Sequence, residues 1–258
     1  MIDFTNCEIN NFKYYGGKNG GKICIKYNNE DYMIKFPGIN EGISEHGYSN
    51  SCISEYISCK IIKAIGLNVQ ETLLGKYRIN NIEKIVVACK DFTSSNTVLK
   101  QFAELKNSQI ETSKNGYGTE LREVIETIEN QQIYDTKELK EFFWNMFIVD
   151  TLLGNFDRHN GNWGFLVNKV TGKISFAPIY DCGSCLNPII EDVEIEKIND
   201  IELKNLAINC YSCLKENGKK INYIAYIKKM ENSECNEAIK DVFNKIEIEK
   251  IMDFIDDI

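Results

Sequence analysis

Two short segments of this sequence place carboxylate and amide side chains in an arrangement suited to phosphoryl transfer. The first is Asp157-Arg-His-Asn-Gly-Asn162, and the second is Tyr180-Asp181-Cys-Gly183. Phosphoryl transfer needs a carboxylate that orients the incoming hydroxyl, and carboxylate and amide oxygens that serve as hard ligands for Mg²⁺. Asp157, Asn162 and Asp181 supply these groups. The alternative is a polar turn that is merely rich in turn-forming residues, and the Asp-x-Gly that follows the hexapeptide disfavours it.

A glycine-rich turn near the N-terminus could supply the other half of a nucleotide site. Its backbone N–H groups can approach phosphates, and Lys35 lies on the following strand, where its ammonium group could reach them. Glu55 lies on an expected helix and could pair with Lys35. The alternatives are an ordinary hairpin turn, a solvated edge lysine and an exposed helix carboxylate. The residues of the turn are Gly16, Gly17, Lys18, Asn19, Gly20, Gly21 and Lys22.

The elements that must position these groups begin with a predicted antiparallel sheet and one helix. Ile23 to Tyr27 and Tyr32 to Phe36 alternate in hydrophobicity and predict a hairpin. Apolar residues then recur every four positions from Ile53 to Ile65, after cap candidates at Ser49 to Ser51, and Gly66 ends the run. A helix is therefore expected to pack on the sheet.

The rest of the chain reads as two more strands followed by a mostly helical region. The strands are expected at Thr72 to Arg78 and Lys84 to Cys89, and a polar connector over residues 90–96 follows them. A short hairpin is expected within residues 163–178. The patterns predict helices at Glu120 to Asn130, Thr136 to Leu153, Glu202 to Leu214 and Ile221 to Met230. We therefore predict an α+β fold with a small antiparallel-sheet N-lobe, residues 1–92, and a larger helical C-lobe, residues 93–258.

Composition excludes several classes of protein. The chain has 258 residues and a net charge of -8, and 43% of its residues are hydrophobic, which is enough for a sizeable core. An acidic chain without a block of Lys or Arg lacks the charge pattern of a nucleic-acid-binding protein. The most apolar stretch is too short for a membrane span, and the N-terminus has no export signal. We expect a cytoplasmic protein with reduced thiols that binds neither nucleic acid directly nor membrane.

In an ordered set of motifs, the chain resembles the HipA-like kinases, and within them the short, CtkA-like branch. The resemblance implies a two-lobed kinase fold with ATP between the lobes. Its catalytic segment also looks like the Asp-Arg-His-x-x-Asn loop of phosphoinositide-kinase-like enzymes, and Asp181 to Gly183 looks like the Asp-Phe-Gly element of protein kinases. The motifs are Gly16 to Lys22, Lys35, Ser54 to Tyr56, Val86 to Phe92, Asp157 to Asn162 and Ala177 to Asp181.

The resemblance also implies a role for individual residues. Asp157 would orient the hydroxyl or act as its base, His159 would face the phosphates, and Lys35 would hold the α- and β-phosphates. Asn162 and Asp181 would bind Mg²⁺. The remaining ATP-binding residues would come from the glycine turn, from Glu55, from the adenine hinge over Ala88 to Phe92, with Cys89, Lys90 and Asp91 at its centre, and from Tyr180.

Three departures from longer HipA-like proteins stand out. The glycine turn begins near residue 14, so the large N-terminal subdomain of full-length HipA toxins is missing, which favours the short branch. The turn contains no Ser or Thr, so the autophosphorylation that switches off HipA cannot occur there. Gly161 stands where many members have Lys, so Arg158, His159 or a residue outside the loop must supply any equivalent positive charge.

The cysteines give a competing interpretation. Cys182 and Cys185 form one C-x-x-C pair, and Cys210 and Cys213 form another at a separation near that of a four-thiolate zinc site. The first pair overlaps the Asp-x-Gly motif, and the second falls in a predicted helix that lacks the turn residues of a zinc knuckle. Because the chain has 10 Cys, chance pairs are expected.

We predict an enzyme that uses ATP and Mg²⁺ to phosphorylate a Ser or Thr hydroxyl of a protein substrate. The resemblance further implies a toxin of the toxin-antitoxin type with an antitoxin or repressor partner. One alternative is a small-molecule or lipid kinase, which would use the same ATP site. A second alternative is a nucleotide-binding regulator without catalytic activity. The intact set of Lys35, Asp157, Asn162 and Asp181 argues against this second alternative.

Overall fold

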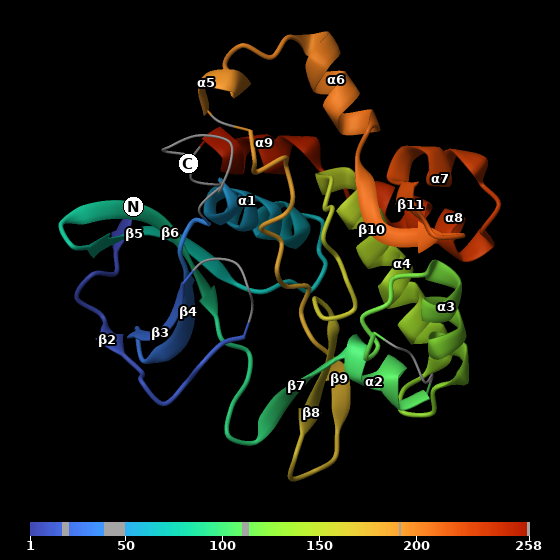
Figure 1. Ribbon diagram of the computed structural model, residues 1–258, viewed down its shortest axis with the longest axis horizontal. Helices are drawn as coiled ribbons and strands as arrows, with labels where there is room; N and C mark the ends of the chain where they lie inside the picture. Colours follow the sequence, from blue (N-terminus) through green and yellow to red (C-terminus); the bar gives the residue numbers. More distant parts are fainter. Residues whose placement is uncertain (17–20, 39–49, 110–113, 191, 257–258) are drawn as a thin grey trace.

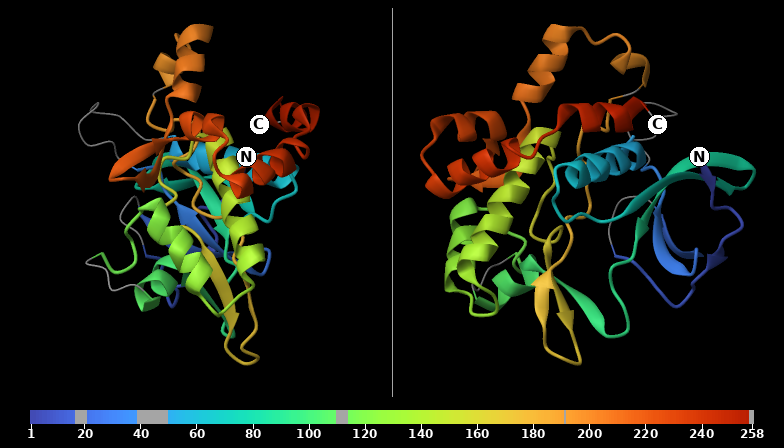
Figure 2. Two further views of the ribbon diagram at one scale, coloured as in Figure 1. Left: turned by 90° about the vertical axis from the view of Figure 1, so that its right-hand side faces the viewer. Right: turned by 180° about the vertical axis from the view of Figure 1, so that it is seen from behind.

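The computed structural model describes residues 1–16, 21–38, 50–109, 114–190 and 192–256. Figures 1 and 2 show a sheet on one side of the molecule, helices on the other, and helix α1 between them. Residues 17–20 of the glycine turn lie outside the described part, as does His46, which the sequence places in a loop rich in Gly and Ser. Within that part, no helix combines the length and the apolar composition needed to cross a bilayer.

Six strands form one sheet in the order β1-β5-β6-β4-β3-β2. β1 runs parallel to β5, and the other neighbours are antiparallel. Two hairpins of this sheet close through Asn-Asn turns, at Asn28-Asn29 and Asn80-Asn81, whose φ angles are 49° and 64° in both cases. Positive φ at both central residues is what a two-residue hairpin turn requires. The strands are β1 (Ile2–Asp3), β2 (Glu8–Ile9), β3 (Lys22–Tyr27), β4 (Glu30–Lys35), β5 (Thr72–Ile79) and β6 (Ile82–Lys90).

Helix α1 (Ser51–Ala64) covers one face of the sheet. Residues of β6 alternate between two packing environments. Val86 and Ala88 join the cluster on the far face, whereas Val87 and Cys89 pack against the α1 side. The predicted helix is confirmed, and Gly66, at a φ of 81°, follows its end. Asn50 is the N-cap residue, but its side chain makes no capping hydrogen bond to the helix.

The helical part packs around α4, whose predicted bounds are confirmed. Asp135 accepts a hydrogen bond from the Glu138 N–H at its start, and Gly154, at a φ of 67°, ends it. Phe143, Trp144 and Phe147 on α4 are buried, and Phe142 is partly buried against the same core. The remaining long elements are α2 (Phe102–Gln109), α3 (Leu121–Asn130), α4 (Thr136–Leu153), α7 (Tyr223–Lys229), α8 (Ser233–Phe243) and α9 (Ile248–Asp256).

A three-stranded sheet has the order β7-β8-β9. Its strand β8 begins directly after the segment from Asp157 to Trp163. The sequence predicted the hairpin of β8 and β9 but missed β7, which pairs with β8 from a distant part of the chain. Two short helices, α5 and α6, follow this sheet and project away from the rest of the molecule (Figure 1). Their bounds and those of the sheet are β7 (Thr97–Gln101), β8 (Gly164–Asn168), β9 (Ile174–Phe176), α5 (Asp192–Ile195) and α6 (Asp200–Ile208).

The predicted helix over Glu202 to Leu214 is wrong in its second half. α6 ends at Ile208, and β10 (Tyr211–Glu216) pairs with β11 (Lys219–Asn222) as a hairpin. The turn is Asn217-Gly218, both at positive φ, and an Asn-Gly pair between apolar runs is a strong hairpin signal. The helical spacing of the apolar residues obscured that signal. Similarly, α7 begins only at Tyr223, where Asn222 caps it.

Candidate active site

The site lies in a cleft of about 2020 Å³ between the N-terminal sheet and the helical part. The predicted residues among those that line it are Gly21, Lys22, Lys35, Glu55, Asp91, Asp157, His159, Asn162, Tyr180 and Asp181. They come from β3, β4, α1, the segment after β6, the loop after α4 and the segment after β9. The fold therefore brings together groups that the sequence spreads over most of the chain.

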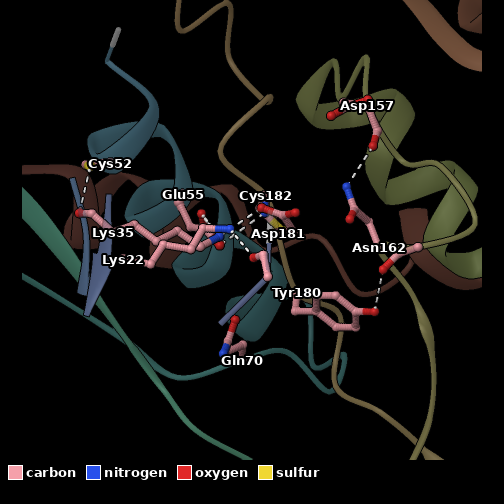
Figure 3. Close-up of polar contacts among 12 residues, drawn as sticks. Lys22, Lys35, Cys52, Glu55, Gln70, Asp157, Asn162, Tyr180, Asp181 and Cys182 are labelled. Atoms are coloured by element: carbon pink, nitrogen blue, oxygen red, sulfur yellow. Dashed lines mark hydrogen bonds and ion pairs between the residues drawn. The ribbon is translucent and has the colours of Figure 1, made fainter. Parts of the chain in front are cut away.

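Lys35 forms the centre of this cleft (Figure 3). Its Nζ lies 2.6 Å from Glu55 Oε2 and 2.8 Å from Asp181 Oδ1. Glu55 is buried on α1, and its Oε1 also accepts a hydrogen bond from the Cys182 N–H at 3.3 Å. One ammonium group thus joins the sheet, helix α1 and the Asp-x-Gly turn. The predicted pairing of Lys35 with Glu55 is present.

The charged side chains of Lys35, Glu55 and Asp181 shift one another's pKa values. Burial alone would lower the pKa of Lys35, but the carboxylates of Glu55 and Asp181 raise it well above its ordinary value. The Lys35 ammonium lowers the pKa of Asp181 to about 2. Burial raises the pKa of Glu55, and Lys35 opposes that rise. Lys35 is therefore a permanent cation, and Asp181 remains a carboxylate at neutral pH.

The backbone at Asp181 is in an unusual conformation. Its φ is 58°, in the left-handed region that non-glycine residues seldom occupy. A Cβ at Gly183 would lie 3.2 Å from Glu55 Oε2 and 3.3 Å from the Ser51 carbonyl, which explains the small residue there. Strained residues of this kind cluster at functional sites.

The segment from Asp157 to Asn162 is a compact loop held by its own polar groups. Asn162 Nδ2 donates to the Asp157 carbonyl at 3.0 Å, and Tyr180 Oη donates to the Gly161 carbonyl at 2.9 Å. His159 Nδ1 accepts from the Gly161 N–H at 3.0 Å, and its ring lines the cleft. Burial raises the pKa of Asp157, and the negative charge of Asp181 adds to that rise.

Arg158 holds this loop through buried contacts and does not line the cleft. Its guanidinium lies 2.9 and 3.1 Å from the two carboxylate oxygens of Asp150 and donates to the carbonyls of Asn162 and Tyr180. Both members of the ion pair are buried. Because its donors are engaged, Arg158 cannot supply the positive charge that many HipA-like kinases have from a lysine at the position of Gly161. His159 or a residue outside the loop must then supply any equivalent charge.

Replacing Arg158 by leucine is expected to lower the free energy of unfolding by about 3–5 kcal/mol, because Asp150 would become a buried charge without its partner. Denaturation in urea measures the change. The matched control is Arg122→Leu, which breaks the exposed pair of Arg122 with Glu126 and should cost less than about 1 kcal/mol. Equal losses for the two variants would show that the buried pair has no special role.

Gly161 is small because its surroundings are filled. A Cβ there would lie 2.8 Å from Tyr117 Cε1 and 2.9 Å from His159 Cε1. Tyr117 packs edge-on against His159 with ring centroids 6.0 Å apart, and it donates to Gln101 Oε1 at 2.9 Å. Tyr117 therefore belongs to the site. Sequence reasoning missed it, because it lies 42 residues before His159 in the chain and no motif marks it.

The hinge residues are placed differently from one another. Cys89 is fully buried, and Lys90 pairs with Glu30 and Glu71; neither side chain lines the cleft. The N–H of Lys90 donates to the Glu71 carbonyl. The Lys90 carbonyl accepts from Gln70 Nε2 at 2.9 Å. Among the predicted hinge residues, Asp91 and Phe92 therefore border the cleft.

Phe92, the last residue of the predicted hinge, lines the cleft together with Gln70 and Thr93, which sequence reasoning did not assign to the nucleotide site. The ring of Phe92 packs against that of Tyr180 with centroids 5.6 Å apart. Thr93 donates through both its N–H and its hydroxyl to Asp91 Oδ1. Thr93 directly follows the predicted hinge, so a register shift of one residue would have included it.

Asp91 ties the hinge to the segment that enters the glycine turn. Its Oδ2 accepts from Tyr15 Oη at 2.6 Å and from Lys13 Nζ at 2.6 Å. Burial and the carboxylate of Asp91 raise the pKa of Tyr15, so the phenol remains a hydrogen-bond donor. Lys22, at the other end of the turn, donates to the Gly16 carbonyl at 2.8 Å.

In a site that binds ATP, as the resemblance implies, replacing Tyr15 by phenylalanine is expected to raise the KM for ATP severalfold, and to change kcat less, because the glycine turn loses one anchor to the hinge. A hydrogen bond to a charged group contributes about 1.5–3 kcal/mol, which sets an upper bound of roughly a hundredfold. Steady-state kinetics with varied ATP measure the effect. Tyr14→Phe is the matched control, because Tyr14 is 88% exposed. An unchanged KM in Tyr15→Phe would contradict the role of the anchor.

The structure does not gather the four C-x-x-C cysteines into one cluster. Among the described residues, no three His, Cys, Asp or Glu side chains are grouped in a way that could hold a metal ion. Cys182 and Cys185 are buried in the main core, and Cys182 Sγ lies 3.5 Å from Arg158 Nη2. Cys213 lies on β10 and not on the predicted helix.

Comparison with known proteins identifies the family. A model of the HipA-like C-terminal domain matches residues 15–249 of this chain. The chain belongs to this family. The serine/threonine-protein kinase CtkA of Helicobacter pylori is 49% identical over 259 residues, which cover 99% of this chain and 78% of that protein.

A solved structure agrees with this assignment. The crystal structure of a Helicobacter pylori proinflammatory kinase CtkA superimposes with a TM-score of 0.91 at 49% identity and covers 100% of this chain and 87% of that one. A Shewanella oneidensis HipA, in complex with HipB and operator DNA, gives a TM-score of only 0.41 at 13% identity. The predictions of the HipA-like family, of the α+β kinase-like fold and of a kinase are confirmed.

Proposed function

We propose that this HipA-like kinase transfers the γ-phosphate of ATP, with Mg²⁺, to a Ser or Thr hydroxyl of a protein. The observation that carries the proposal is the double ion pair of Lys35 with Glu55 and Asp181, in the cleft that also holds Asp157 and Asn162. A lysine paired with a helix glutamate beside a metal-binding aspartate is the arrangement that kinases use. The Ser/Thr acceptor is carried over from the 49% identical kinase.

In this proposal each residue acts mainly by position and charge. Lys35 binds the α- and β-phosphates, and Glu55 holds its ammonium in place. Asp157 accepts a hydrogen bond from the acceptor hydroxyl and takes its proton, and His159 faces the phosphates. The glycine turn with Lys22 covers the phosphates, and the segment from Cys89 to Phe92 with Gln70 borders the adenine.

The side chains of Asn162 and Asp181 fit a hard cation. Asp181 offers an ionised carboxylate, and the Asn162 amide is oriented by its Nδ2 bond to Asp157, so its oxygen is the atom that it can offer. Two protein oxygens suit Mg²⁺, which usually retains several waters and substrate phosphate oxygens as ligands. When bound, Mg²⁺ would neutralise charge on the β- and γ-phosphates.

We place the boundary between the lobes at residues 92 and 93. The Asp91 N–H still donates to the Asp31 carbonyl of the sheet at 2.9 Å, whereas β7 pairs with β8. Residues 1–92 would form the N-lobe and 93–258 the C-lobe. A toxin role with an antitoxin or repressor partner remains a proposal that rests on the family alone.

Incubation of the protein with Mg²⁺ and γ-labelled ATP tests the proposed function. The arms are the protein alone, the protein with a cell lysate, and the protein with inositol lipids or sugars. Label on Ser or Thr of a protein is the expected result. Label on a lipid or sugar would establish the alternative substrate class, and measurable ATP binding without any transfer would favour a nucleotide-binding regulator.

The rate of transfer is expected to rise with pH through an ionisation above the ordinary pKa of aspartate, 3.8, because Asp157 must be ionised and its pKa is raised. Burial and Asp181 raise that pKa, while His159, Arg158 and Lys220 oppose the rise. The pH dependence of kcat/KM measures the ionisation of the free enzyme. A midpoint at or below 3.8 would contradict the assignment of Asp157.

A further inference from the structure

The chain that leaves the Asp-x-Gly turn forms a fixed surface at the mouth of the cleft. Asn50, at the start of α1, donates through its N–H to the Pro188 carbonyl at 2.8 Å and through Nδ2 to the Ile190 carbonyl at 3.1 Å. Ser54 Oγ donates to the Cys185 carbonyl. Leu186 is held at a φ of 54° and is 42% exposed, which is an unfavourable conformation for a branched residue.

Beyond this surface, α5 and α6 form an arm, defined here as residues 192–210, that stands apart from the core (Figures 1 and 2). α6 has nine residues and buries none of them. It is held by a capping box, in which Asn199 accepts from the Glu202 N–H and Glu202 accepts from the Asn199 N–H. Because isolated helices shorter than about 12–15 residues are marginal in water, this helix lacks the packing that normally stabilises one.

Large apolar side chains are exposed along the arm and the segment before it. Their exposure shows how little the arm packs on the core, and none of those on the arm lines the groove described next. Those of the arm, with their exposed fractions, are Val193 at 59%, Ile195 at 50%, Ile201 at 74%, Leu203 at 60% and Ile208 at 36%. Ile189 just before it is 47% exposed.

A groove of about 530 Å³ runs between the arm and the segment after the Asp-x-Gly turn. Ile190, Ile198 and Leu206 give it an apolar floor, and Glu194 and Glu202 lie among its lining residues. The neighbouring residues Pro188 and Ile189 line the ATP cleft together with Asp157. The groove and the cleft therefore meet along one stretch of chain, and a peptide could occupy both.

The charge of this region selects the kind of partner. Residues 186–210 carry six Asp or Glu and two Lys. A basic segment would be attracted, whereas a second copy of this chain, with a net charge of -8 and an equally acidic arm, would be repelled.

We infer that this groove docks the protein substrate through a segment, next to its phosphoacceptor in sequence, that is rich in Lys or Arg and carries large apolar side chains. The inference rests on the proposed function, because it names the substrate class of that site. The acceptor hydroxyl would lie at Asp157 while the flanking segment occupies the groove.

The test measures docking separately from transfer. A fluorescein-labelled peptide with Leu at helical spacing, Lys at the other positions and one Ser is titrated with the protein, and fluorescence anisotropy reports binding. A second peptide has Glu in place of Lys. The groove variant is Glu202→Gln with Leu206→Ser, in which Gln keeps the capping box. The matched control is Glu196→Gln with Leu203→Ser, two arm positions outside the groove lining.

The Lys peptide is expected to bind the parent and the control variant alike, and to bind the groove variant at least about tenfold more weakly. The Glu peptide should not bind. Equal weakening in the groove and control variants would overturn the inference, as would binding of both peptides or of neither. Label transfer to the Lys peptide is measured in parallel. Binding that depends on the groove, without label transfer, supports docking and contradicts the proposed function. Label transfer at the same rate by the parent and the groove variant supports the proposed function and contradicts docking in the groove.

Discussion

The substitution Asp157→Ala is expected to lower the rate of phosphoryl transfer strongly while ATP binding in the presence of Mg²⁺ remains close to that of the parent. Asp157 lines the cleft, but its carboxylate makes no ion pair with Lys35 or Arg158 among the described interactions, whose partners are Glu55, Asp181 and Asp150. Its removal therefore leaves the nucleotide-binding charges in place. A positioned general base contributes about 10²–10⁴-fold to a rate, and we expect a loss in that range.

Two measurements on the same preparation check this prediction. Isothermal titration with Mg-ATP gives the affinity, and label transfer gives the rate. Asp241→Ala, at an exposed position of α8, is the matched control for loss of one aspartate. Undiminished transfer in Asp157→Ala would refute the role of Asp157 in transfer. A parallel loss of affinity for Mg-ATP and of transfer rate would show instead that Asp157 binds the nucleotide.

Asparagine at position 181 is expected to remove the dependence of ATP binding on Mg²⁺ and to lower transfer by at least about a hundredfold. Asp181 is the ionised carboxylate of the pair proposed to hold the metal, and its pKa of about 2 keeps it charged at neutral pH. In the variant, Lys35 retains Glu55 at 2.6 Å, so the lysine should remain charged and ordered. Titration of ATP with and without Mg²⁺ measures the effect.

The same variant has a second, independent signature. Because the folded pKa of Asp181 lies below the ordinary value of 3.8, its ionised form stabilises the fold above that value, and this contribution disappears as the pH falls through about 2. Asp181→Asn should therefore be less stable than the parent at neutral pH, and the two should converge near pH 2. The contribution is modest, since the side chain is 41% exposed. Mg²⁺-dependent ATP binding that survives in the variant would contradict the metal assignment.

The loop proposed to be catalytic could be located from sequence because its residues are neighbours in the chain. Asp157 and Asn162 are five residues apart, and the Asn162 amide donates to the Asp157 carbonyl within the loop. The helix before it was predicted with its correct bounds, since Asp135 and Gly154 are strong start and stop signals that act through neighbouring backbone groups.

The errors lie where distant chain segments decide the structure. β7 is a strand because β8, far along the chain, pairs with it, and its own residues carry little periodicity. Cys213 was expected on a helix, but β11 supplies hydrogen-bond partners that make its segment a strand. Local propensity is a weak prior that such pairing overrides.

The sequence by itself was enough to predict the family, which the comparisons confirm, and to nominate the residues proposed for phosphoryl transfer, because residue types and short spacings are written in it. Only the tertiary structure decided that Lys35 meets a glutamate 20 residues away and an aspartate 146 residues away. It also decided that Arg158 is a buried anchor and that Tyr117 occupies the space beside Gly161. Each of these depends on which surfaces pack together, and packing depends on the whole chain.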